Sequence, residues 1–160
     1  MGLRAQGIMA GYAGRLGVRV PRLCVLGVRG PLAWMLGNAR AVVPLGVIVV
    51  RRDVLERHSE KALRFLLAHE VAHFCYPQYW LFVSLVVLVL LGVGSAVSLL
   101  PIGMVLVACA VIIGGGFVVQ RELVADLMGA RLAGERAYRA YLRECRPTFS
   151  TRMVYRRLAR

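Results

Sequence analysis

Acidic residues are scarce in this chain, whose 160 residues include eight Asp and Glu against 21 Lys and Arg, a formal net charge of +13. Charged residues of either sign are missing altogether between Phe74 and Gln120, and 59% of the whole chain is hydrophobic. A soluble domain of this length could hardly bury so long an apolar block on all sides, which argues against a pair of core helices. The block is internal, which is not the position of a signal peptide.

Other features are also missing. The cysteines have no C-x-x-C spacing, which argues against a cysteine zinc site and favours free thiols in a cytoplasmic setting; they are Cys24, Cys75, Cys109 and Cys145. The basic residues are not interleaved with aromatics and form no known nucleic-acid-binding module, so no nucleic-acid partner is expected. Membrane topology and attraction to anionic lipid head groups explain the positive charge instead.

The uncharged block is long enough to cross a membrane twice, because one helical crossing needs about 20 apolar residues. The stretch Ser95–Pro101 offers a turn, which predicts a transmembrane hairpin over residues 80–119, with helices at about 80–97 and 102–119. Arginines gather before and after the hairpin, and its turn is uncharged. By the positive-inside rule both polar parts are expected to be cytoplasmic. We therefore expect a multi-pass integral protein of the inner or plasma membrane, with the lipid bilayer as a partner.

Histidine is rare too, and two of the three histidines fall in His69-Glu70-Val71-Ala72-His73. Residues i and i+4 of a helix lie on the same face, so His69 and His73 can reach one metal ion with Glu70 beside them. Apolar neighbours predict a buried helix, on which such polar side chains are costly unless they have a partner. The pattern predicts one Zn²⁺ per chain, with Glu70 as the general base of a hydrolase.

A catalytic zinc site uses three protein ligands and one open position. Glu122 is the predicted third ligand, because it stands where the second span returns to the membrane face that holds His73. Asp126 follows one helical turn later and is predicted to accept the free N–H of a ligating histidine. The alternative is an ordinary Glu–Asp pair on a solvated helix face.

Around the motif the pattern predicts an α+β fold, a single domain over residues 1–160. Strands are expected at residues 23–28, 39–43 and 47–50, the last of them β-branched throughout. Ser59 is the expected N-cap of the motif helix, Pro77 its end, and residues 121–132 should continue the second span as helix. The fold class predicted is therefore a small catalytic domain, made of a short sheet and the H-E-x-x-H helix, with the hairpin inserted between the two zinc-ligand helices.

These residues resemble the membrane-associated zinc metalloproteases that include the heat-shock protease X type and the CAAX prenyl endopeptidases, which are gluzincins with a zincin-like domain. The similarity lies in 67–73 (LAHEVAH), 121–126 (RELVAD), and Asn38-Ala39 followed by 46–50 (GVIVV). It implies that Asn38, Val47, Ile48 and Val49 form an edge strand that pairs with substrate backbone.

The resemblance also covers a tail motif, H-P-[ST]-x-x-x-R in the family, whose His and Arg approach the zinc site. Here residues 146–152 keep the spacing, but Arg146 replaces the histidine, with Arg152 at the final position. Arg146 could stabilise an oxyanion as a cation. The substitution puts this part of the family mechanism in doubt.

The leading hypothesis is an integral-membrane zinc endopeptidase acting on a peptide or protein substrate that the sequence does not identify. One alternative is a degenerate, non-enzymatic zinc-binding membrane module that acts as a sensor or assembly factor. Another is a basic membrane-surface scaffold in which H-E-x-x-H is a coincidence. Because the chain is short for the family, a homo-oligomer or a separate membrane partner could complete the site.

Overall fold

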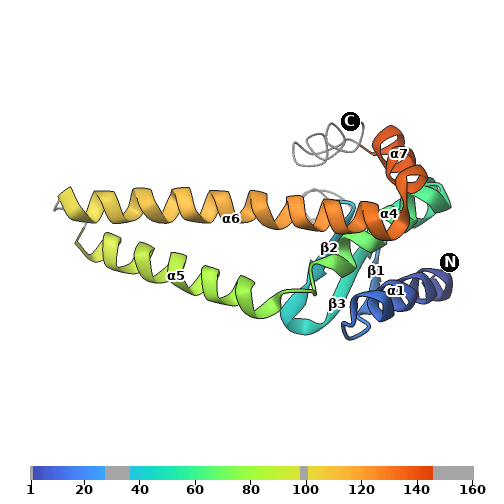
Figure 1. Ribbon diagram of the computed structural model, residues 1–160, viewed down its shortest axis with the longest axis horizontal. Coiled ribbons are helices and arrows are strands. Elements are labelled where there is room, and N and C mark those ends of the chain that lie inside the picture. The colour runs from blue at the N-terminus through green and yellow to red at the C-terminus, as the bar shows by residue number, and fades with distance from the viewer. Residues whose placement is uncertain (1, 28–36, 98–100, 146–160) are drawn as a thin grey trace. The chain divides into compact units, whose positions relative to one another are not determined.

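The computed structural model describes residues 2–27, 37–97 and 101–145 of the chain, with the backbone alone at residues 77–81. It is a mostly helical α+β protein with one small sheet (Figure 1). In chain order the elements are α1 (Gly2–Leu16), β1 (Arg22–Leu26), β2 (Ala39–Val42), the 3-10 helix η1 (Val43–Leu45), β3 (Val47–Arg51), α3 (Arg52–Arg57), α4 (Glu60–Ala72), α5 (Pro77–Ala96), α6 (Pro101–Ala133) and α7 (Glu135–Glu144). The chain divides into two compact units, residues 1–75 with 123–160, and residues 76–122.

The three predicted strands form the sheet of the first unit in the order β1-β3-β2. The central strand β3 pairs in parallel with β1 and antiparallel with β2. The prediction that Val47, Ile48 and Val49 form an open edge strand is therefore wrong, because both sides of β3 are already hydrogen-bonded. Ile48 and Val50 are fully buried. In the described sheet, β1 and β2 hold the edge positions.

Helix α4 begins as predicted at Ser59, whose hydroxyl oxygen accepts a hydrogen bond from the backbone N–H of Ala62. It ends earlier than predicted, because His73 is its C-cap and residues 74–76 leave the helix. Pro77 begins α5 instead of closing α4, which fits the tolerance of the first helical turn for a residue without an N–H.

The core of the first unit lies between α1, the sheet and α4. Leu67, Ala68 and Val71 of α4 pack in one cluster with Met9 of α1 and Ile48 of β3. A second cluster joins α4 to α6 and α7 through Phe65, Ala130 and Tyr138, which are nearly or fully buried. The metal-motif helix is therefore covered by apolar packing from several directions, which fixes its side chains in place.

Helix α5 and the part of α6 up to Glu122 form the second unit, and the two helices approach each other closely within it. A Cβ built on Gly94 of α5 would lie 2.8 Å from a methyl of Val107 of α6, and one built on Gly114 would lie 3.5 Å from Val87. By length and composition, α6 is the single described helix that qualifies as a membrane span; the apolar part of α5, Phe82–Ala96, is shorter. The predicted continuation of the second span is confirmed, since α6 runs unbroken to Ala133.

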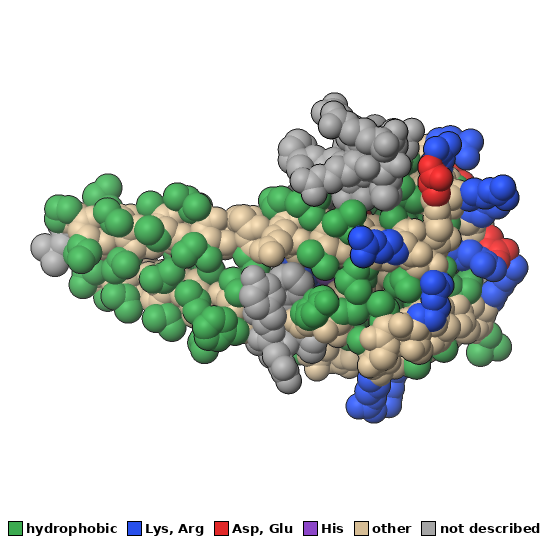
Figure 2. All heavy atoms as spheres, in the orientation of Figure 1, with side chains coloured by type: hydrophobic (Ala, Val, Ile, Leu, Met, Phe, Trp, Pro, Cys, Tyr) green, Lys and Arg blue, Asp and Glu red, His purple; other side chains and the backbone are tan. Residues whose placement is uncertain are grey.

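The surfaces of the two units differ in composition (Figure 2). On the face shown, the described charged side chains lie on the first unit, and hydrophobic side chains run along the second. Large apolar side chains of the second unit that are at least half exposed include Phe82, Leu85, Leu88, Val89, Val93, Ile102, Met104, Val105, Val111, Ile112 and Val118.

Candidate metal centre

Helix α4 carries the three polar residues of the motif on a buried face. Glu70 is 5% exposed and His73 is 4% exposed. His73 is the C-cap but keeps right-handed helical dihedral angles, so the one-turn relation to His69 is preserved. The two imidazole rings lie with centroids 4.9 Å apart and nearly perpendicular to each other. The sequence spacing therefore produces two adjacent imidazoles beside a buried carboxylate.

Glu122 of α6 joins the two histidines. One ligand atom from each of His69, His73 and Glu122 lies within 4.8 Å of the others, and they form the single group of this kind in the described residues. Glu122 is the last residue before the division between the units, one peptide bond from Leu123 of the first unit, on an uninterrupted helix. The structure thus brings together the three residues that the sequence predicted as zinc ligands.

The chemistry of this group fits a zinc ion. Two imidazole nitrogens and one carboxylate oxygen are a common catalytic zinc donor set that leaves a fourth position open. Donor atoms around a tetrahedral zinc lie about 3.4 Å apart, because the metal–ligand bonds are about 2.0–2.1 Å long. The three donor atoms all lie within 4.8 Å of one another, so side-chain rotations would bring them to that spacing.

Asp126 lies beside this group, as predicted. Its Oδ1 is 2.9 Å from Nδ1 of His69, and its side chain is 2% exposed. The other oxygen, Oδ2, is buried without a hydrogen-bond partner among the described residues. A buried carboxylate with one partner is costly in an apolar setting. A cation held by His69 would reduce that cost, which is a second observation in favour of a metal.

The carboxylate of Glu70 is held by the sheet. Its Oε2 accepts a hydrogen bond of 2.6 Å from the backbone N–H of Ala41 in β2, and this contact is buried. A backbone donor cannot rotate away, so the contact fixes the position of the glutamate relative to the edge strand. Sequence reasoning did not find this link, because it joins residues 29 apart in the chain.

The geometry of β2 explains why Ala41 faces the site. The N–H of Arg51 bonds the carbonyl of Asn38, and the antiparallel register pairs Arg40 with Val49. Hydrogen-bonded and non-hydrogen-bonded pairs alternate along such a ladder. The N–H and C=O groups of Ala39 and Ala41 therefore point away from β3, toward the outer edge where Glu70 lies. Of the predicted substrate-strand residues, Asn38 alone adjoins this edge.

Tyr141 of α7 is a residue that the sequence reasoning missed. It shares a side-chain hydrogen bond with Asn38, and its ring lies 4.8 Å from that of Phe65. Burial raises the pKa of Tyr141 above its usual value, and the negative charges of Asp126 and Glu70 act in the same direction. The hydroxyl therefore keeps its proton at neutral pH. The sequence pattern that could have identified Tyr141 is its spacing from Tyr138, because residues three apart lie on one helix face.

Arg146 and Arg152, which were predicted to approach the site, lie outside the described residues. Their role stays a prediction.

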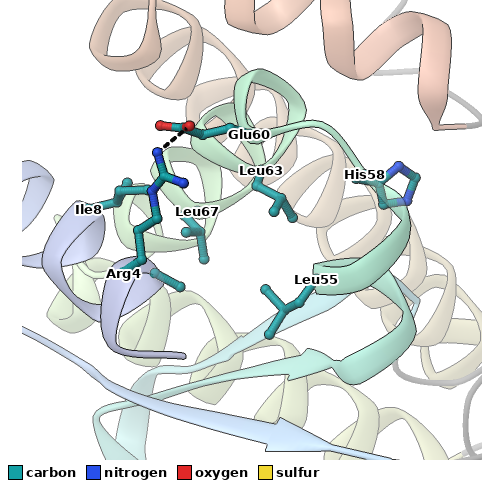
Figure 3. A pocket seen from close by; sticks show the side chains of 8 residues that line it. Arg4, Ile8, Leu55, His58, Glu60, Leu63 and Leu67 are labelled. Carbon is teal, nitrogen blue, oxygen red and sulfur yellow. Dashed lines mark hydrogen bonds and ion pairs between the residues drawn. The ribbon is translucent and has the colours of Figure 1, made fainter. Parts of the chain in front are cut away.

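A separate hollow of about 170 Å³ lies at the N-terminal half of α4 (Figure 3). Leu67 lines it and is two residues from His69, which places the hollow on nearly the opposite side of the helix from the metal ligands. An ion pair of 2.5 Å between Arg4 and Glu60 stands at its rim. The lining residues are Arg4, Ala5, Ile8, Leu55, His58, Glu60, Leu63 and Leu67. None of the candidate ligands contributes to it.

A family model supplies independent support. The model for peptidase family M48 matches residues 31–144 of this chain, well over half its length. The chain belongs to peptidase family M48. The matched segment contains every described element from β2 to α7, including α4 and the whole of α6. No curated protein and no solved structure matches the chain.

Membership in family M48 makes the chain a metallopeptidase homologue, and the metal of such peptidases is typically zinc. The resemblance found in the sequence is confirmed at the level of this family, whereas a subtype within it is not decided by the match. The matched segment ends at residue 144, ahead of Arg146.

Proposed function

We propose that the chain is an integral-membrane zinc endopeptidase whose active site faces the cytoplasm. The observation that carries the proposal is the meeting of His69, His73 and Glu122 beside the buried carboxylate of Glu70. When bound, zinc would polarise a substrate carbonyl and lower the pKa of an attacking water to about 7.

The chain's own residues would then carry the remaining steps. Glu70 takes the proton from the attacking water and delivers it to the leaving amine, which completes cleavage of the peptide bond. The N–H of Ala41 holds this carboxylate during both transfers. Asp126 orients His69 through Nδ1 and so presents its other ring nitrogen to the metal.

The outer edge of β2 is the proposed substrate track. The backbone groups of Ala39 and the carbonyl of Ala41 point away from β3, so an extended peptide could pair with them as an added strand. Such pairing uses main-chain groups and therefore tolerates many sequences. A strand that runs past Glu70 on both sides also suits cleavage inside a chain, which favours an endopeptidase.

The membrane part of the proposal rests on the second unit. Helix α6 has the length and composition of a span, and α5 packs against it through Gly94 and Gly114. The apolar side chains that cover both helices are largely exposed, as lipid-facing residues would be. Arginines flank the segment at both ends, so the positive-inside rule places both ends, and hence the catalytic unit, in the cytoplasm.

Glu70→Gln in the purified full-length chain tests the catalytic role. The amide removes the base and keeps the ligands, so we expect zinc at near one per chain and cleavage of an unfolded protein slowed by about 10²–10⁴-fold or more. Glu135→Gln is the control, because that carboxylate is on the surface of α7. Stoichiometric zinc with no cleavage by wild type would favour the non-enzymatic module instead. Absence of zinc from carefully purified wild type would contradict both.

A separate experiment tests the topology. Single cysteines are placed at either end of residues 76–122 in a variant without other cysteines. They should be protected from a membrane-impermeant thiol reagent in intact cells and become labelled after lysis. Labelling of either end from outside would contradict a cytoplasmic hairpin. Release of the chain by alkaline carbonate would contradict membrane insertion.

A further inference from the structure

Gly129 of α6 lies against the backbone of the metal-motif helix. A Cβ built at this glycine would stand 3.0 Å from the backbone N of His69, 3.1 Å from its Cα and 3.3 Å from its Cβ. These atoms belong to the helix backbone or are bonded to it, so they cannot move aside as the end of a flexible side chain could. The two helices therefore approach each other at residue 129 more closely than a side chain there would ordinarily allow.

Two other glycines of the same helix differ from Gly129 in this respect. A Cβ built at Gly115 or Gly116 meets nothing within 4 Å. A glycine inside a helix destabilises that helix because the unfolded chain has more conformational freedom there, so each such glycine needs a structural reason. For Gly129 the structure gives a direct answer, which is the close approach of α6 to His69.

The position of Gly129 along α6 connects this approach to the candidate ligands. Glu122, Asp126 and Gly129 are four and three residues apart, so they share one face of the helix. On that face Glu122 is a candidate ligand, Asp126 lies beside the His69 ring, and Gly129 contacts the His69 backbone. Because α6 is one continuous helix, the separation set at Gly129 also sets how far the two carboxylates reach.

We propose that Gly129 is a positioning residue for the metal centre, and this rests on the proposed zinc site. Its missing side chain fixes the α4–α6 distance at which Asp126 meets His69 and Glu122 joins both histidines. A methyl group at residue 129 moves α6 away from α4, and this movement changes the distances between Glu122 and the two histidines. Ala130, the next residue, lies in one buried cluster with Phe65 of α4, so the contact around Gly129 is itself closely packed.

The test is Gly129→Ala in the full-length chain, with zinc affinity measured by chelator competition and the site geometry read from the visible spectrum of the Co²⁺-substituted protein. We expect zinc affinity to fall at least tenfold and the Co²⁺ spectrum to change. Gly116→Ala is the matched control on the same helix and should leave both unchanged. Wild-type affinity and an unchanged spectrum in Gly129→Ala would overturn the proposal.

Ala130→Gly separates positioning from loss of helix stability. It weakens the same turn of α6 without adding volume at the contact with His69. We expect its metal-free form to melt at a lower temperature while zinc affinity stays within twofold of wild type. A tenfold loss of affinity in this variant as well would overturn the proposal, because any weakening of α6 would then explain the result.

Asp126→Glu keeps the proposal testable if Gly129→Ala does not fold. At a fixed helix separation the added methylene overfills the space before His69, so zinc affinity should fall at least tenfold. Wild-type affinity would show that the separation is not held tightly, which would overturn the proposal. If wild type itself binds no zinc, the proposed function fails; if wild type and Gly129→Ala bind equally, only the role of Gly129 fails.

Discussion

Oδ1 of Asp126 lies 2.9 Å from Nδ1 of His69, and the aspartate side chain is almost completely buried. In a zinc site such a carboxylate fixes the tautomer and orientation of the ligating ring. It also adds a negative charge that strengthens the ligand as a donor. This pair therefore links α6 directly to the motif on α4.

Asp126→Asn should weaken zinc binding by about 10–100-fold, the usual effect of losing such a partner. The amide has nearly the same size, so the packing of α6 should survive, but it has no charge and can present its N–H₂ group to the ring. Chelator competition on the full-length chain measures the change. Glu135→Gln provides an exposed control on α7. Equal zinc affinity in Asp126→Asn and wild type would show that Asp126 does not support His69.

The metal centre could be predicted from helical spacing and from the course of the apolar segment. Helical spacing alone places His69 and His73 together, and the return of the apolar segment brings Glu122 back to them. The edge-strand role predicted for β3 was wrong. Its continuous run of β-branched residues is typical of a strand covered on both sides, and the structure places this strand at the centre of the sheet.

The contacts that sequence reasoning missed are all long-range. The bond from Ala41 to Glu70 and the approach of Gly129 to His69 join segments that only the tertiary fold brings together. Helix α7 was missed because its apolar residues are few and separated by charges, as in E-R-A-Y-R-A-Y-L-R-E. The periodicity of such a helix does not indicate which other element its apolar face packs against.

Tyr141→Phe should weaken substrate binding more than it slows chemistry. The substitution keeps the ring against Phe65 but removes the hydroxyl that is hydrogen-bonded to Asn38, the residue leading into β2. A less fixed edge strand would raise KM several-fold with a smaller change in kcat. The stability loss should be about 1 kcal/mol, which is typical of one hydrogen bond.

A double-mutant cycle with Asn38→Ala checks this assignment. If the two residues act through their mutual bond, the effects on KM should be non-additive, with the double variant close to either single one. Additive effects would mean that Tyr141 and Asn38 influence the substrate independently.

Gly94→Ala should destabilise the second unit. The new Cβ would lie 2.8 Å from a methyl of Val107, 3.0 Å from the backbone N of Val107 and 3.1 Å from the carbonyl of Gly103. Helix pairs in lipid depend on small residues at such contacts. We expect a loss of about 1–3 kcal/mol, as for other overpacked sites.

Thermal unfolding of the full-length chain in detergent measures this effect. Gly92→Ala is the matched control, because a Cβ at Gly92 meets nothing within 4 Å. Zinc stoichiometry should be unchanged in both variants. Equal melting temperatures of Gly94→Ala and Gly92→Ala would contradict close packing of α5 on α6.

Glu144→Gln should remove a pH-dependent contribution to stability. Glu144, at the end of α7, accepts hydrogen bonds from both the backbone N–H and the hydroxyl of Ser59, the N-cap of α4. Burial raises the pKa of Glu144, but these bonds and the nearby His58 outweigh burial and hold the pKa below its usual value. A carboxylate with a lowered pKa stabilises the fold above the pKa it has when unfolded, about 4.3.

The sign of the pH dependence follows from that direction. The melting temperature of wild type should exceed that of Glu144→Gln by a constant amount above about pH 5.5, because Glu144 is then ionised in both folded and unfolded chains. The difference should shrink as the pH falls through the lowered pKa, where protonation removes the charge-assisted bonds. Because the side chain is 30% exposed, the full effect should stay at or below about 1 kcal/mol. Melting curves from pH 3 to 8 measure it, and a difference that does not change with pH would show that Glu144 acts through packing alone.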